Sequence, residues 1–146
     1  MTAAALSNHP HVVTESWEIR IEKEADIIAV RQLVRELTKG YKFDQFAAAA
    51  LTTAASELSR NVWVHARGGI AKVEVLKGER MGLELSFVDK GPGIADLPRT
   101  LAGGYSTANS LGLGLSGTRR LVDEFHIDSE PGRGTTIVIR KWKKEF

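Results

Sequence analysis

The stretch DQFAAAALTTAASELSRNVWV, residues 44–64, indicates the kind of fold. Its alanines favour a helix, and the side chain of Asp44 is placed to cap the start of that helix. Because small residues let a helix approach its neighbour closely, we expect this helix to pack on a β-sheet. Its expected buried face consists of Phe46, Ala50, Leu51, Ala54, Leu58 and Val62.

A strand and a helix are expected before this stretch. Residues 17–22 alternate apolar and polar side chains, which is the pattern of a strand with one buried face. Apolar residues then recur at helical spacing between Ile27 and Leu37, and Gly40 is positioned to end that helix. Residues 1–15 have no clear periodicity and are expected to form a flexible leader, so that residues 16–146 make up a single domain.

The second half of the chain predicts a hairpin, a long loop, a helix and two further strands. Residues 70–76 and 81–88 alternate well and are separated by a turn, so they are expected to pair antiparallel. Residues 89–114 are rich in Gly, Pro, Ser, Thr and Asn, and loops of this length usually carry function. The remaining elements are expected to be a helix at 113–125, a strand from residue 126 and a strand at 135–142.

Composition places the chain among folded, water-soluble domains. Of its 146 residues, 42% are hydrophobic and 26% are charged, and Lys plus Arg exceed Asp plus Glu by only 20 to 18. There is no cysteine, which excludes disulfides and thiolate metal sites and fits a reducing cytoplasm. No apolar run is long enough to span a bilayer. The dense basic patch is Arg140, Lys141, Lys143 and Lys144, for which a solvated surface is favoured over a phosphate-binding role.

Four short motifs contain the residues that point to chemistry. Glu57 and Asn61 are one helical turn apart, so a carboxylate and a carboxamide face the same way. The segment 89–93 places an aspartate and two glycines at the end of a strand. Residues 110–115 bring glycines to the start of a helix, where free N–H groups and the helix dipole attract anions such as phosphate. Residues 132–136 form a glycine-rich turn. Each motif alone also fits an ordinary helix face or turn.

In this order, the motifs resemble the N, G1, G2 and G3 boxes of the GHKL ATPase superfamily, which shares the Bergerat ATP-binding fold. They read ExxxN at 57–61, DxGxG at 89–93, GLGL at 112–115 and GxGT at 132–135. The runs SELSRN at 56–61, GYST at 104–107 and LVDEF at 121–125 resemble the switch serine/threonine kinases of the bacterial stressosome and the related anti-sigma-factor kinases. The resemblance implies a two-layer α/β sandwich with helices on one face of a mixed β-sheet.

The resemblance also implies a role for each motif. Asp89 would accept a hydrogen bond from the adenine amino group of ATP, and Asn61 would donate an oxygen ligand to Mg²⁺. Glu57 would be the general base for the attacking hydroxyl, and residues 96–111 would form a mobile lid. The residues implied in nucleotide binding are Asn61, Asp89, Gly91, Gly93, Ile94, Ser106, Thr107, Gly112, Leu113, Gly114, Leu115 and Thr135.

The function that the resemblance implies is that of a cytoplasmic serine/threonine kinase. Such a kinase uses Mg-ATP to phosphorylate a partner with a sulfate-transporter/anti-sigma-antagonist (STAS) domain in a stress-response partner switch, and activates a PP2C-type phosphatase when released. Two alternatives stay open: an anti-sigma-factor kinase that sequesters a sigma factor, and a non-catalytic module whose nucleotide state tunes protein binding. Neither nucleic acid nor a membrane is expected as a partner.

Two groups of side chains stay without a firm role at this point. Arg60, Arg119 and Arg120 are cations near the motifs, and the sequence does not distinguish which of them reaches the γ-phosphate. The histidines, including His65, show no metal-ligand spacing, so solvated or packing roles are expected for them.

Overall fold

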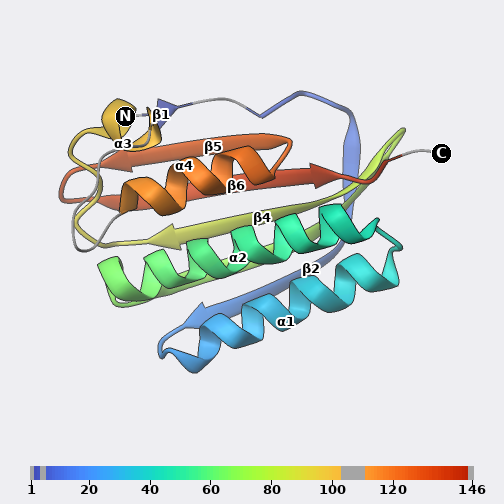
Figure 1. Cartoon of the computed structure of the whole chain (residues 1–146), viewed down its shortest axis with the longest axis horizontal. Helices are drawn as coiled ribbons and strands as arrows, with labels where there is room; N and C mark the ends of the chain where they lie inside the picture. The colour runs from blue at the N-terminus through green and yellow to red at the C-terminus, as the bar shows by residue number, and fades with distance from the viewer. Residues whose placement is uncertain (1, 4–5, 103–110, 145–146) are drawn as a thin grey trace.

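One layer of the molecule is a six-stranded β-sheet with strand order β1-β5-β6-β4-β3-β2 (Figure 1). The computed structural model describes residues 2–3, 6–102 and 111–144. Within these residues, each strand pairs antiparallel with its neighbours. The strands are β1 (Thr2–Ala3), β2 (His11–Ile21), β3 (Gly69–Gly78), β4 (Met81–Asp89), β5 (Glu124–Glu130) and β6 (Gly134–Trp142).

The antiparallel pairing corrects one detail of the expected fold, which was a mixed sheet. Strands β4 and β5 run in the same direction, because both are antiparallel to β6. They would form a parallel pair as neighbours, but β6 lies between them. The two-layer α/β sandwich is confirmed, since α1, α2 and α4 cover one face of the sheet (Figure 1).

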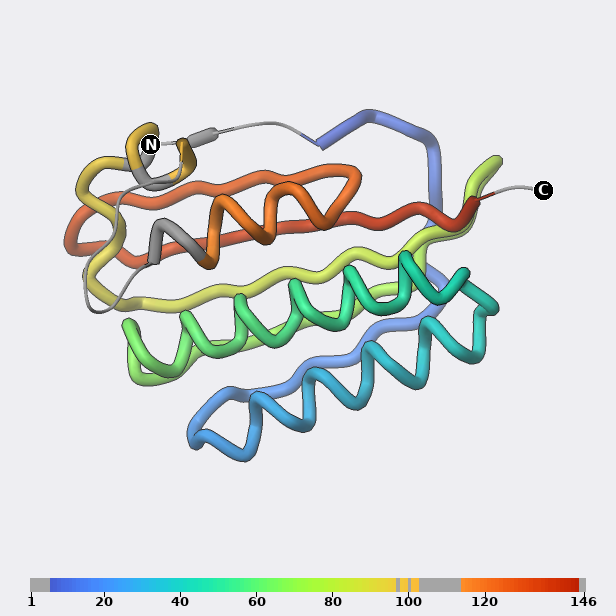
Figure 2. The backbone as a smooth tube through the Cα atoms, viewed as in Figure 1, coloured from blue at the N-terminus to red at the C-terminus, as the bar shows by residue number. Residues whose placement is uncertain are grey.

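Helix α2 lies at the centre of the second layer, between α1 and α4 (Figure 2). The side chain of Asp44 caps it as expected, accepting a hydrogen bond from the Ala47 N–H at 2.8 Å. None of the helices in the part of the chain that the structure describes has the length and apolar character needed to cross a membrane. The helices are α1 (Ala25–Gly40), α2 (Gln45–Ala66), α3 (Leu97–Ala102) and α4 (Leu111–Leu121).

The apolar core fills the space between the helices and the sheet. Alternate residues of the central strands point into it, including Val73, Leu85 and Ile139, each at most 1% exposed. Two expectations about α2 were wrong, because Phe46 is 88% exposed and Ala50 is only half-buried and lies outside the core. The buried stripe recurs four residues before Leu51, which places Ala47 rather than Phe46 against the core. The core residues of α2 are Ala47, Leu51, Ala54, Ala55, Leu58 and Val62.

Several element boundaries differ from those expected, and two of the differences add residues to the sheet. Strand β2 begins at His11, so residues 11–15, which we expected in the leader, belong to the sheet. The pairing of β2 with β3 shifts between Val13 and Glu15, and this irregularity interrupts the alternation that would have marked the strand in the sequence. Helix α4 ends at Leu121, and Phe125, expected at its end, is a buried residue of β5.

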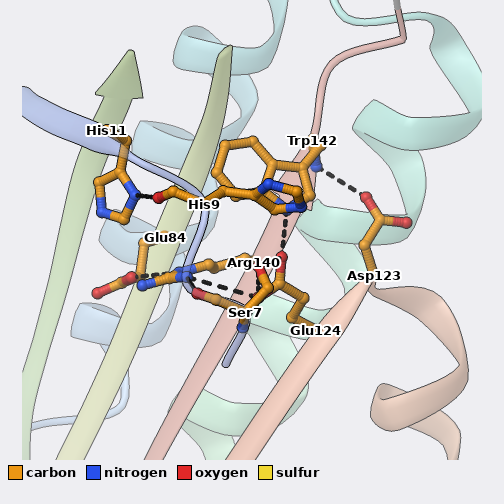
Figure 3. A network of polar contacts seen from close by, with 8 residues as sticks. All are labelled: Ser7, His9, His11, Glu84, Asp123, Glu124, Arg140 and Trp142. Carbon is orange, nitrogen blue, oxygen red and sulfur yellow. Dashed lines mark hydrogen bonds and ion pairs between the residues drawn. The ribbon is translucent and has the colours of Figure 1, made fainter. Parts of the chain in front are cut away.

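A buried polar network lies on strands β4, β5 and β6 (Figure 3). Arg140 is directly opposite both Glu84 and Glu124 in the strand register. Its guanidinium lies 2.6 Å from Glu84 Oε2 and 3.5 Å from Glu124 Oε1, and it also donates to the carbonyl of Ser7. Trp142 donates its indole N–H to Glu124. Arg140, which we expected in a solvated basic patch, is therefore a buried residue that ties the N-terminal segment to the sheet.

The hydrogen bonds around Glu124 favour its ionised form. Burial by itself raises the pKa of this carboxyl. The hydrogen bonds from Trp142 and Ser7, together with the charge of Arg140, outweigh that effect and hold the pKa below its usual value. The network therefore stabilises the fold above the unfolded-state pKa of a glutamate, and this contribution is lost as the pH falls through the lowered folded-state pKa.

We predict that Arg140→Met lowers the free energy of unfolding by about 3–5 kcal/mol at neutral pH, because it leaves two facing carboxylates without their cation. The deficit should shrink at acidic pH, where protonation removes the negative charges. Chemical denaturation at neutral and acidic pH measures both effects. Arg20→Met is the matched control: its pair with Glu22 is exposed, and the loss should stay below about 1 kcal/mol. Equal losses in the two variants would contradict this account.

Candidate active site

Helix α2 carries Glu57, Asn61 and His65 at intervals of about one turn, so the three side chains lie along one side of the helix. A Cβ atom placed on Gly114 of α4 would lie 3.4 Å from Asn61 Nδ2 and 3.6 Å from Glu57 Oε2. The carboxylate and the amide therefore converge on the first turns of α4. A side chain at position 114 would occupy the space between them.

A cavity lies beside this convergence, bounded by α2, α4 and the ends of β4 and β6. Most of its walls are apolar, and its polar groups come from a few side chains, among them His65 and Asp89. The lining, in a cavity of about 30 Å³, has the composition of a small-molecule site. Of the residues expected in the site, Asn61, Asp89, Gly93, Ile94, Leu115 and Thr135 line the cavity.

Asp89 is the half-buried carboxylate at the C-terminal end of β4. Burial raises its pKa, while hydrogen bonds from the backbone of Gly91 and Thr135 and the nearby His65 act in the opposite direction. The Gly91 N–H donates to Asp89 Oδ1 at 2.9 Å, which fixes the carboxylate at the cavity wall. A fixed carboxylate in an apolar cavity is suited to accept a hydrogen bond from a ligand amino group.

Ser129 of β5 is a site-supporting residue that the sequence analysis missed. Its buried hydroxyl accepts from the Ile94 N–H at 2.9 Å and lies 2.8 Å from the Thr135 hydroxyl. It also donates to the Gly134 carbonyl at 3.2 Å. One serine therefore joins the loop after β4 to the β5–β6 turn. A serine in a strand gives no sequence signal for this role, because it depends on two loops that are distant in the chain.

The glycines of these loops allow the protein backbone to pack on itself. Gly93 has φ of +75°, and a Cβ there would lie 2.2 Å from the Glu130 carbonyl oxygen. Gly134 has φ of +107°, and a Cβ there would lie 2.2 Å from the Asp89 carbonyl oxygen. A Cβ at Gly91 would likewise come within 2.6 Å of the Ala66 Cβ. The structure thus gives all three glycines a packing role that the motifs alone did not indicate.

The glycine-rich motif at residues 110–115 lies only partly within the described residues. Gly112, Leu113 and Gly114 belong to the first turns of α4, so the helix begins at Leu111, earlier than expected. Ser106 and Thr107, together with the rest of residues 103–110 in the expected lid at 96–111, lie outside the described residues. Arg119 and Arg120 lie in the last turn of α4, at the opposite end from the glycines. Arg60, by contrast, lies 3.4 Å from Glu57 Oε1.

His65 lines the cavity, although we expected only a solvated or packing role for it. Burial lowers its pKa, and the neighbouring Asp89 carboxylate opposes that shift. The sequence did hold a signal for this position. His65 follows Asn61 by four residues, as Asn61 follows Glu57, so a helix that presents the first two residues to a site presents the third as well.

The donor set around Asn61 fits a magnesium ion that is bound mainly through a nucleotide. Asn61 Nδ2 is buried and has no hydrogen-bond partner among the described residues. Those residues also contain no cluster of three His, Cys, Asp or Glu side chains able to hold a metal alone. Mg²⁺ commonly takes only one or two protein oxygens and completes its shell with phosphates and waters. The amide oxygen of Asn61 would be the protein ligand in such an arrangement.

The fold and the site together define a nucleotide-binding α/β sandwich. Residues 47–145 match the family described as histidine kinase-, DNA gyrase B-, and HSP90-like ATPase. The chain belongs to this family of ATPases, as the order of the four motifs implied.

Two relatives carry more specific names. Serine/threonine-protein kinase RsbT of Bacillus subtilis (strain 168) is 42% identical over 125 residues, which cover 85% of this chain and 94% of that protein. An anti-sigma F factor of Clostridium beijerinckii is 29% identical over 96 residues, which cover 61% of this chain and 66% of that protein.

Solved structures support the fold. The SiaB-SiaC complex of Pseudomonas aeruginosa contains a chain with a TM-score of 0.54 and 13% identity, with coverage of 89% of this chain and 90% of that one. Full-length ShkA in complex with AMPPNP matches with a TM-score of 0.53 and 15% identity, and covers 97% of this chain and 33% of that one. At these identities, the similarity concerns the architecture alone.

We predict that Gly93→Ala lowers the free energy of unfolding by more than about 2 kcal/mol, because the added Cβ meets the Glu130 carbonyl in a backbone conformation that disfavours side chains. Gly117→Ala is the matched control. Gly117 is exposed within α4, and a Cβ there would project into open space, so alanine should stabilise the helix by about 0.5–1 kcal/mol. Urea denaturation of both variants tests the pair, and a Gly93→Ala protein as stable as the wild type would refute the packing role.

Proposed function

We propose that the chain is a serine/threonine protein kinase that transfers the γ-phosphate of Mg-ATP to a hydroxyl of a partner protein. The observation that carries this proposal is the convergence of Glu57 and Asn61 on Gly114, next to a cavity that holds Asp89. The 42% identity to a serine/threonine kinase over most of both chains supports the same reaction. A module that only bound nucleotide would not require a carboxylate beside the metal ligand.

In this proposal, ATP lies with its adenine in the cavity and its phosphates at the start of α4. The Asp89 carboxylate accepts from the adenine amino group, and Thr135 and Ile94 contribute to the walls of the base pocket. The first-turn N–H groups of α4, near Gly112 and Gly114, face the phosphates with the positive end of the helix dipole. Ser106, Thr107, Leu113 and Leu115 remain proposed nucleotide contacts on the basis of the motif.

In this proposal Asn61 would hold Mg²⁺, which would supply positive charge against the phosphates. Glu57 accepts the proton of the attacking hydroxyl while the hydroxyl oxygen bonds to the γ-phosphorus. At the same time the bond between the γ-phosphorus and the bridging oxygen breaks, and ADP leaves with that oxygen. Arg60 is the best placed of the three candidate arginines, because it already lies beside Glu57. A cation there would attract the γ-phosphate and orient the carboxylate.

The finer assignment concerns the partner. We propose a STAS-domain protein as the substrate, a cytoplasmic location, and a PP2C-type phosphatase that is activated when the kinase is released. The sequence runs shared with stressosome switch kinases support this choice. The second candidate function is sequestration of a sigma factor, which the 29% identity to an anti-sigma F factor supports. Phosphorylation of a purified STAS domain by the chain, compared with capture of a sigma factor, distinguishes the two.

We predict that Asp89→Asn weakens ATP binding about tenfold to more than a hundredfold, because a charge-assisted hydrogen bond worth about 1.5–3 kcal/mol is lost. Calorimetric titration with a non-hydrolysable ATP analogue measures the effect. In the wild type, affinity should also fall as the pH drops through the pKa of Asp89, which burial raises. An asparagine variant with wild-type affinity would remove Asp89 from the base pocket.

Glu57→Gln should separate chemistry from binding. The variant should bind ATP with nearly wild-type affinity, since Glu57 does not line the base cavity. Phosphate transfer to the partner should slow by about 10² to 10⁴, the usual contribution of a positioned general base. Single-turnover assays with labelled ATP measure the rate. Transfer at the wild-type rate would show that another group accepts the proton.

Asn61→Ala should reduce the part of ATP affinity that depends on Mg²⁺, because a water must replace the amide oxygen. Titrations with and without the metal, in wild type and variant, isolate that part. Asn61→Asp is the informative second variant, because it keeps an oxygen ligand and should keep the metal dependence. If Asn61→Ala and the wild type respond equally to Mg²⁺, Asn61 is not a metal ligand.

A further inference from the structure

The start of helix α2 presents an apolar surface that the proposed kinase site does not use. Phe46 is 88% exposed in the first turn of the helix, and it lines a groove of about 330 Å³ with Ala49, Ala50, Thr53 and Leu121. A second groove of about 620 Å³ shares Gln45, Ala49 and Thr53 with the first and extends to α1. We call the two together the α2 groove. Single exposed apolar side chains are ordinary, but this one lies beside two adjoining grooves that together reach all three helices of the layer.

The charged side chains that line the α2 groove are both cations. Arg35 and Lys39 of α1, both exposed, are the charged residues among those that line it. More cations lie near the first turn of α2. The Ala47 N–H is the main cause of the lowered pKa of Asp44, and the positive charges of Lys144 and Lys141 lower it further against the effect of burial. The basic residues at and just beyond the end of β6 therefore lie close enough to the start of α2 to act on its capping residue.

The α2 groove is remote from the proposed ATP site. Phe46 and Asn61 are separated by about four turns of α2, or about 22 Å at the usual helical rise. The C-terminal end of β6 and the start of α2 lie on the same side of the molecule, whereas β4 ends at the other side (Figure 1). A partner in the groove would leave the ATP cavity accessible.

We propose that the α2 groove is a docking surface for an acidic amphipathic helix of a partner protein. An apolar hollow with an aromatic residue at its edge suits the apolar face of such a helix, in the manner of helix-in-groove recognition. The surrounding cations require acidic residues on the flanks of that helix. A second copy of this chain would bring the same cations together, so charge disfavours self-association through this surface. This inference does not depend on the kinase assignment.

The test uses a synthetic amphipathic peptide with leucines at helical spacing on one face and glutamates on both flanks, and a matched peptide with lysines in place of the glutamates. Fluorescence anisotropy with the full chain should show at least tenfold tighter binding of the glutamate peptide. Added salt should weaken that binding. Backbone amide shifts should map the peptide to the first half of α2 and to α1 near Lys39.

Three variants make the test specific. Phe46→Ser should weaken binding of the glutamate peptide at least tenfold, and Lys39→Glu should reverse the preference between the two peptides. Ile28→Ser, which removes another exposed apolar side chain of the helical layer outside the α2 groove, should change neither. All three variants should bind ATP as the wild type does, because none of the changed residues lines the ATP cavity. The peptide result therefore tests the α2 groove separately from the kinase proposal.

Several outcomes would overturn the proposal. Absence of glutamate-peptide binding, equal binding of the two peptides, or unchanged binding by Phe46→Ser would each do so. Sedimentation velocity supplies the remaining outcome. If the wild type forms dimers and Phe46→Ser abolishes them, the α2 groove binds a second copy of this chain instead of an acidic partner.

Discussion

The close approach of helix α2 to the sheet is the contact on which the rest of the structure depends. Ala54 and Ala55 are completely buried at the centre of that contact, and larger side chains there would push the helix away. At the C-terminal half of the helix, Gly69 leaves room for Val62, and Gly91 leaves room for Ala66. The distance between helix and sheet sets the width of the cavity, so the packing of small residues determines what the site can hold.

The two faces of the sheet are packed differently, one by apolar contacts and the other in part by a polar network. The helices bury one face with ordinary apolar packing. On β4, β5 and β6, Arg140 instead meets two carboxylates and the backbone of Ser7. Polar packing of this kind is sensitive to the loss of any one partner, because the others remain buried with unmatched charge. Specific polar contacts of Ser7 therefore hold the N-terminal segment against the sheet.

Much of the fold and the motif positions could be predicted from the sequence, because periodicity reports directly on local structure. The cap at Asp44, the strand ends near Asp89 and Thr135, and the shared side of Glu57 and Asn61 all follow from spacing. The remaining features depend on tertiary contacts. The location of β6 between β4 and β5, and the role of Ser129, require knowledge of which distant segments meet. Phe46 shows a related limit, since two adjacent positions both fitted the apolar stripe and only packing selected Ala47.

The central location of β6 has a consequence for how the chain reaches its native state. Strand β6 follows all the other described strands in the sequence, yet it pairs with β4 on one side and β5 on the other. Before it is added, the β2–β3–β4 meander and β5 have no shared hydrogen bonds within the described sheet. During synthesis, the domain therefore cannot complete its sheet until residues 134–142 have left the ribosome. Until then, the unpaired edge of β4 is open to pairing with other chains.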